Sequence, residues 1–141
     1  MENINALDEI HKGSCMGMDA IHFILDKVED KSFKKILENQ YKKYEELKCK
    51  IEKVYPKYND DKPHETTKMN KVMTKTGIEM RTLTDKSTSK IAELLLQGTN
   101  MGIIEGRRIL NKKDINSEVN DIINEYVTMQ EENVEVFKKY L

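Results

Sequence analysis

Residues 85–110 read DKSTSKIAELLLQGTNMGIIEGRRIL and carry the pattern from which the architecture follows. Apolar residues recur there at helical spacing, which predicts one long helix with a buried face. Three glycines, Gly98, Gly102 and Gly106, fall one turn apart on one side of that helix. Because a glycine inside a helix costs about 1 kcal/mol relative to alanine, the series indicates that another backbone packs there too closely for side chains. Glu105 lies beside this glycine seam.

The same periodicity predicts helices on both sides of this stretch. Before it come two long amphipathic segments separated near residues 30–31, and Pro56 ends the second of them. A shorter amphipathic segment precedes the central stretch, and a last long one follows it. The predicted helices span residues 3–29, 32–55, 65–83, 86–112 and 116–140.

The lengths of the connections predict how these helices are arranged. Short connections make consecutive helices antiparallel neighbours, so the first two and the last two form hairpins. The connection between the hairpins is about thirty residues long and contains the 65–83 helix, so it can run the full length of a bundle. The expected fold is therefore all-α: one four-helix-bundle domain over residues 1–141, with a long crossover that carries a shorter fifth helix.

Charge and composition argue against several classes of function. The chain has 24 basic and 25 acidic residues, mixed along its length, so nucleic acid is not an expected partner. No run reaches the roughly eighteen apolar residues of a membrane span, and the first residues lack the apolar segment of a secretory signal. We expect a cytoplasmic protein in which Cys15 and Cys49 are reduced thiols, although the sequence leaves a disulfide between them open.

Two blocks of sequence carry a resemblance to a known family. The first hairpin contains LDEIHKGSCMGMDAIHFILDKVEDKSFKKIL, and the second contains IAELLLQGTNMGIIEGRRIL followed by an amphipathic helix. In pattern and spacing these blocks, with the crossover between them, resemble the ferritin-like superfamily, and more closely small bacterial four-helix-bundle proteins of that group. The resemblance covers nearly the whole chain and implies a ferritin-like four-helix bundle.

The metal-binding members of that superfamily hold two irons with one Glu from each of two helices and an ExxH sequence from each of the other two. This sequence contains no ExxH, and its three histidines are His11, His22 and His64. His11 and His22 lie about 16 Å apart along one helix and cannot share a metal. The sequence therefore argues against a di-iron site and against the iron oxidation and peroxidase chemistry found in the family.

The strongest remaining candidate for a metal site combines His11 with Glu105. If the hairpins align by heptads, His11 lies level with Ile51, and the second hairpin brings Glu105 and Ile123 into the same layer. One interpretation is a degenerate mononuclear site for iron or manganese with His11 and Glu105 as ligands. The other is a buried, hydrogen-bonded pair that fixes the register of the helices. Two ligands fall short of a typical site, which favours the pair.

Other polar residues on the inner stripes predict a small polar pocket near this layer. Its expected lining is Ser14, Gln40, Tyr126 and Gln130. We predict no catalytic residue, because no nucleophile has a well-placed base and no glycine-rich phosphate loop occurs. The apolar side of the 65–83 helix predicts a surface for a partner helix, which belongs either to a second copy of this chain or to another protein.

These observations predict a binding or structural module that catalyses no reaction and holds no cofactor. The alternative is a metal-binding oxidoreductase or a metal-storage protein with a degenerate site around His11 and Glu105. Protection of DNA, which some ferritin-like proteins provide, is disfavoured by the balanced charge.

Overall fold

The computed structural model describes residues 2–59, 62, 63, 65, 67–112 and 114–141, except for the side chains of Lys68 and Met69. His64 lies outside the described residues. Within them every regular element is a helix, which confirms the all-α prediction. The α-helices are α1 (Glu2–Ile24), α2 (Lys31–Val54), α3 (Lys68–Arg81), α4 (Thr88–Leu110) and α5 (Ser117–Lys138), and 3₁₀ turns follow α1 (Leu25–Lys27) and α2 (Tyr55–Lys57).

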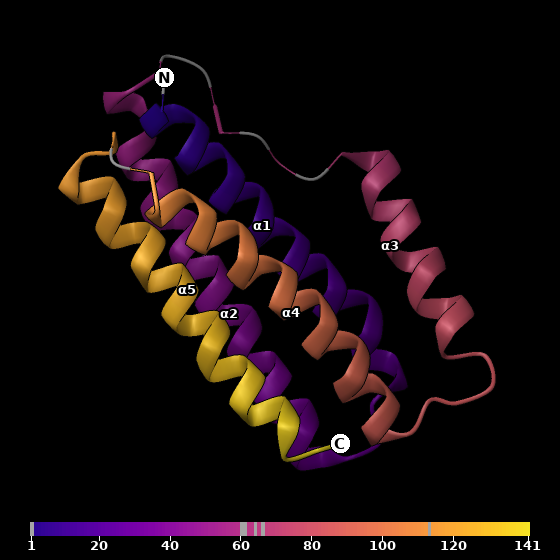
Figure 1. The fold of residues 1–141 in the computed structure, drawn as a ribbon. Coiled ribbons are helices and arrows are strands. Elements are labelled where there is room, and N and C mark those ends of the chain that lie inside the picture. Colours follow the sequence, from indigo (N-terminus) through magenta and orange to yellow (C-terminus); the bar gives the residue numbers. More distant parts are fainter. Residues whose placement is uncertain (1, 60–61, 64, 66, 113) are drawn as a thin grey trace.

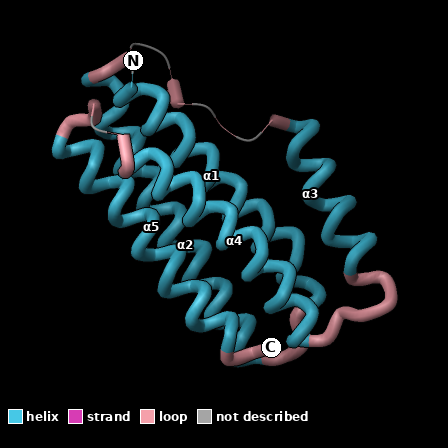
Figure 2. The backbone as a smooth tube through the Cα atoms, in the orientation of Figure 1, coloured by secondary structure: helices cyan, strands magenta, loops and turns pink. Residues whose placement is uncertain are grey.

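Four of the helices form an elongated bundle, and α3 runs along its outside (Figure 1). α1 packs against α2 and α4 packs against α5, each pair through a short connection, so that both pairs are antiparallel hairpins (Figure 2). The segment that carries α3 joins the two hairpins and returns the chain to the opposite end of the bundle (Figure 1). As a result α2 and α4 run in the same direction.

The first helix is shorter than predicted. It ends at Ile24, passes through the 3₁₀ turn and does not continue to residue 29, because Val28 is extended with φ −85° and ψ 117°. The next helix begins at once: Asp30 is its N-cap, and its Oδ1 accepts a 2.9 Å hydrogen bond from the backbone N–H of Phe33. An extended residue followed by a capping aspartate stops one helix and starts another within a few residues.

The core follows the apolar stripes of the four long helices. Its fully buried side chains include Leu7, Ile10, Phe33, Leu37, Leu47, Ile51, Ile91 and Ile123. At one end of the bundle the Phe33 and Phe137 rings meet edge to face, with centroids 6.2 Å apart. In the part of the chain that the structure describes, no helix is long and apolar enough to cross a membrane.

The glycine seam of α4 differs from its prediction, because side chains rather than a backbone occupy it. A Cβ on Gly102 would lie 2.8 Å from the Tyr126 hydroxyl and 2.9 Å from Gln130 Nε2. At Gly106 a Cβ would collide with Cγ2 of Val127, whereas at Gly98 it would meet no atom within 4 Å. Gly102 and Gly106 therefore receive side chains of α5, and Gly98 faces open space.

Apart from Ile78, the described large apolar side chains of α3 face away from the bundle. Thr74, Gly77 and Ile78 form its half-buried face, and Ile78 packs against the core. Val72 and Met73 are each 64% exposed, and Met80 is 68% exposed. This outward face belongs to the predicted 65–83 partner surface, and the binding of a partner there stays a prediction.

The glycine environments predict opposite effects of the same substitution. Gly98→Ala has free space for its Cβ, so the gain in helix propensity should raise the free energy of unfolding by up to about 1 kcal/mol. Gly106→Ala must displace Val127 in a packed interface, so overpacking should lower the free energy of unfolding by about 1 to 2 kcal/mol. Urea denaturation measures both changes. Gly77→Ala is the control for Gly98→Ala, because its Cβ also meets nothing; equal stabilisation by Gly106→Ala would contradict the packing described here.

Candidate functional site

A cleft of about 360 Å³ opens between α1 and α4. Its walls are mainly apolar side chains and glycines of these two helices, with Thr99 among them, and residues of α2 and α5 form its floor. Thr74 of α3 reaches one edge. We call this space the α1–α4 cleft; its volume falls within the range of about 300 to 1,000 Å³ that is typical of sites for small molecules.

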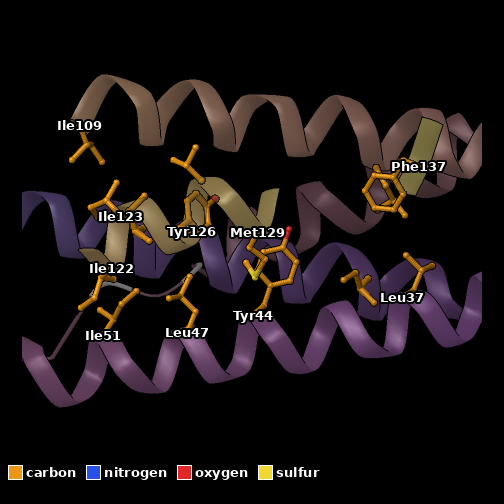
Figure 3. Close-up of a cluster of buried hydrophobic side chains, with 14 of the residues drawn as sticks. Leu37, Tyr44, Leu47, Ile51, Ile109, Ile122, Ile123, Tyr126, Met129 and Phe137 are labelled. Carbon is orange, nitrogen blue, oxygen red and sulfur yellow. The ribbon is translucent and has the colours of Figure 1, made fainter. Parts of the chain in front are cut away.

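Two tyrosines on the floor are seated against glycines of the walls. Tyr126 of α5 reaches between the walls, since its hydroxyl lies 2.6 Å from the position of a Cβ on Gly13 and 2.8 Å from that on Gly102. Tyr44 of α2 lies against Gly17 in the same way, with its ring 2.6 Å from the position of a Cβ. Figure 3 shows both rings within the buried cluster. Any larger residue at Gly13, Gly17 or Gly102 would have to displace a tyrosine.

The tyrosines meet a polar group below the cleft. The hydroxyl of Tyr44 donates a 2.6 Å hydrogen bond to Gln130 Oε1, and Asn133 Nδ2 donates one of 3.3 Å to the same oxygen. Burial raises the pKa of Tyr44 above its ordinary value, and it also raises that of Tyr126. Both phenols therefore stay neutral at any physiological pH.

Among the described polar residues of the floor, Gln40 is the one with a buried side-chain atom that makes no hydrogen bond. It lines the cleft, it is only 5% exposed, and its Nε2 has no hydrogen-bond partner. A buried donor without a partner costs about 1 to 3 kcal/mol. Such a group in a native protein calls for an explanation, and a molecule in the cleft is one.

Charged residues lie at the mouth of the cleft, on both of its walls. Glu9 and Lys12 come from α1, and Glu105 comes from α4. The Glu105 side chain is 54% exposed and pairs with Arg108 on its own helix at 3.3 Å. Glu105 therefore does not face His11 in the core. It stands beside the seam of Gly102 and Gly106, and those glycines, rather than Glu105, face the interior.

His11 finds a different carboxylate partner. It is 1% exposed, and its Nε2 donates a 3.0 Å hydrogen bond to Glu52 Oε1 on α2. This bond and the neighbouring Lys48 hold the pKa of Glu52 below its usual value. The Sγ of Cys15 lies 3.9 Å from the other ring nitrogen of His11. Both nitrogens of the buried imidazole are thus in contact with neighbouring side chains.

Glu65 adds a third metal-ligating group at this place. One ligand atom from each of His11, Glu52 and Glu65 lies within 4.8 Å of the others. Lys48 competes for the carboxylates, because its Nζ lies 3.6 Å from Glu52 Oε1 and 3.7 Å from Glu65 Oε1. The ammonium offsets one of the two carboxylate charges, so ion pairs hold part of this cluster together without a metal.

The residues predicted to line one polar pocket separate into two groups. The structure places Gln40, Tyr126 and Gln130 on the floor of the α1–α4 cleft, whereas Ser14 is buried outside the lining and donates to the carbonyl of Ile10 at 2.9 Å. Sequence reasoning missed Tyr44, which shares an inner stripe with Gln40 and so carried a usable signal. It also missed Glu52, although that residue follows Ile51, which the heptad alignment places level with His11.

Both cysteines are free thiols, Cys15 buried and Cys49 exposed. The disulfide that the sequence left open is therefore not formed in this structure.

Comparison with protein-family models, with curated proteins and with solved structures gives no match for this chain.

The buried Tyr44 predicts a loss of stability at high pH. Its pKa is raised in the folded protein, so unfolding returns it toward about 10 and releases a proton that the native state keeps. The contribution of Tyr44 to the free energy of unfolding is therefore fully present below about pH 10 and is lost as the pH rises above that value. We expect Tyr44→Phe to cost about 1 kcal/mol at neutral pH, from the lost bond to Gln130.

Urea denaturation at about pH 7, 9 and 10.5 tests this prediction. Between the two alkaline values the free energy of unfolding should fall less in Tyr44→Phe than in the wild type. Identical slopes would show that the Tyr44 phenol ionises as readily in the folded protein as in the unfolded one.

Proposed function

We propose that this protein binds a small, largely apolar molecule in the α1–α4 cleft and catalyses no reaction on it. The observation that carries the proposal is the cleft itself, whose floor holds the buried, unpartnered amide of Gln40. Small-molecule sites are concave and mostly apolar, and they contain a few polar groups that orient the ligand. The cleft has each of these properties.

The lining favours binding over catalysis. Among the described residues that line the cleft there is no cysteine, serine or histidine. The serine–histidine and cysteine–histidine pairs of covalent catalysis are therefore missing from this lining. Tyr44 and Tyr126 have raised pKa values, which makes them poor bases near neutral pH.

We further propose that the bundle is ferritin-like in its arrangement. Two antiparallel hairpins joined by one long crossover support this assignment. Bundles of that kind place their sites between facing helices, and the α1–α4 cleft has this position. The absence of ExxH from the sequence is consistent with a bundle that holds a small molecule in place of two irons.

N-phenylnaphthylamine tests the proposal, because it is uncharged and its fluorescence rises in apolar surroundings. We expect saturable fluorescence enhancement with the wild type. Gly98→Leu should reduce the affinity at least about tenfold, since its side chain extends from an open glycine position into the cleft.

Gly77→Leu is the matched control. Its Cβ also meets nothing within 4 Å, but Gly77 lies on α3 and does not line the cleft. It should bind the probe like the wild type. Equal binding by Gly98→Leu, or loss of binding only in Gly77→Leu, would contradict the proposal.

A second candidate function is the binding of iron or manganese by His11, Glu52 and Glu65. The close approach of their ligand atoms favours it, and it replaces Glu105 of the sequence-based hypothesis by the carboxylates that stand near His11. Three protein ligands meet the usual minimum for a mononuclear site, and solvent supplies the remaining positions. When bound, such a metal would supply Lewis-acid or redox chemistry.

Metal analysis after anaerobic incubation with Fe(II), and separately with Mn(II), tests this candidate. About one metal should stay bound per chain, and His11→Ala should remove it. Glu105→Ala is the control and should keep it, because Glu105 pairs with Arg108 at 3.3 Å. No metal above background in the wild type would leave the cluster as ion pairs around Lys48 alone.

A further inference from the structure

We infer that the ligand of the α1–α4 cleft is uncharged at its buried end and carries there a carbonyl-type hydrogen-bond acceptor that Gln40 recognises. This inference rests on the proposed function and adds the chemical class of the ligand. A ketone, an ester or an amide fits the description.

The side-chain N–H group of Gln40 is available to donate a hydrogen bond. Its Nε2 is fully buried and makes no hydrogen bond, while the neighbouring Gln130 amide oxygen already receives bonds from Tyr44 and Asn133. Of the two glutamines on the floor, only Gln40 has an amide nitrogen that is fully buried without a hydrogen-bond partner. The terminal torsion of a glutamine side chain is broad, so its amide can rotate toward an acceptor in the cleft.

The charge around the cleft excludes an ion at the buried end. Its charged lining residues are Glu9, Lys12 and Glu105, and all three stand at the mouth. Two carboxylates stand against one ammonium in the lining, and Arg108 outside it pairs with Glu105 at 3.3 Å, so the mouth has no excess of positive charge that would draw an anion inward. A carboxylate placed beside Gln40 would lose its hydration without meeting a cation, at a cost of several kcal/mol.

The walls fix the nature of the remainder of the ligand. Ile21 and Leu95 of the walls and Phe137 of the floor supply apolar surface, and Gly98 leaves room beside them. A flat hydrocarbon body with one oxygen at its inner end satisfies this lining. The oxygen relieves the unpaired donor of Gln40, and the body displaces water from the apolar walls.

Three fluorinated probes of matched shape test the inference: para-fluoroacetophenone, para-fluoroethylbenzene and para-fluorobenzoate. Fluorine NMR gives their affinities. The ketone should bind the wild type about tenfold more tightly than the ethyl compound, since the ethyl group cannot accept a hydrogen bond from the amide. The benzoate should bind most weakly. In Gln40→Leu the preference for the ketone should disappear, while the ethyl compound binds as well as before.

Gln97→Leu is the matched control, because Gln97 is exposed on α4 and does not line the cleft. It should keep the preference for the ketone. If the ketone and the ethyl compound bind the wild type equally, or if the benzoate binds most tightly, the inference is overturned and the proposed function stands. If none of the three binds, both are overturned.

Discussion

The seating of two tyrosine rings against glycines of the facing helices sets the geometry on which the rest of this structure depends. Tyr126 reaches from α5 between Gly13 of α1 and Gly102 of α4, and Tyr44 reaches from α2 against Gly17. Each ring fills the space that a side chain at the glycine would otherwise occupy. Both tyrosines also line the α1–α4 cleft, so the same contacts shape the core and the site.

Burying polar side chains on the floor of the cleft costs free energy, and hydrogen bonds within the protein offset only part of this cost. Gln130 is buried, but two donors satisfy its oxygen, and a satisfied polar network specifies one arrangement of a core. Gln40 is buried without a partner for its Nε2. Natural proteins satisfy nearly all of their buried polar groups, and the exceptions tend to lie at functional sites. Gln40 is such an exception, and it lies at the bottom of a cleft. This coincidence of cavity and unpaired donor is why we assign binding to the cleft and not to the cluster around His11, where Lys48 already pairs with both carboxylates.

Much of the fold could be predicted from the sequence because the long helices repeat their apolar residues at helical spacing, and because Pro56 and Asp30 mark helix ends locally. The side chains that pack against the glycines of α4 could not be predicted in this way. A glycine seam shows that something approaches closely, but tyrosines and a backbone produce the same signal. The partner of His11 was misassigned for a related reason: heptad alignment gives the layer of a residue and not the reach of its neighbours. Glu52 lies on the outward-facing side of α2, where its side chain is 41% exposed, but its carboxylate still reaches the His11 imidazole. Gln40 and Gln130 were placed in one pocket because both interrupt apolar stripes, a signal that needs no knowledge of contacts.

The most direct test of the central claim is the response of methionine methyl NMR signals to N-phenylnaphthylamine. Met16 and Met101 line the cleft, whereas Met80 is exposed on α3 and Met129 is buried outside the lining. If the tyrosine-supported cleft is the binding site, the Met16 and Met101 methyl signals shift with increasing probe and those of Met80 and Met129 stay in place. A shift of Met80 with Met16 and Met101 unchanged would place the probe on the apolar face of α3 and contradict the account.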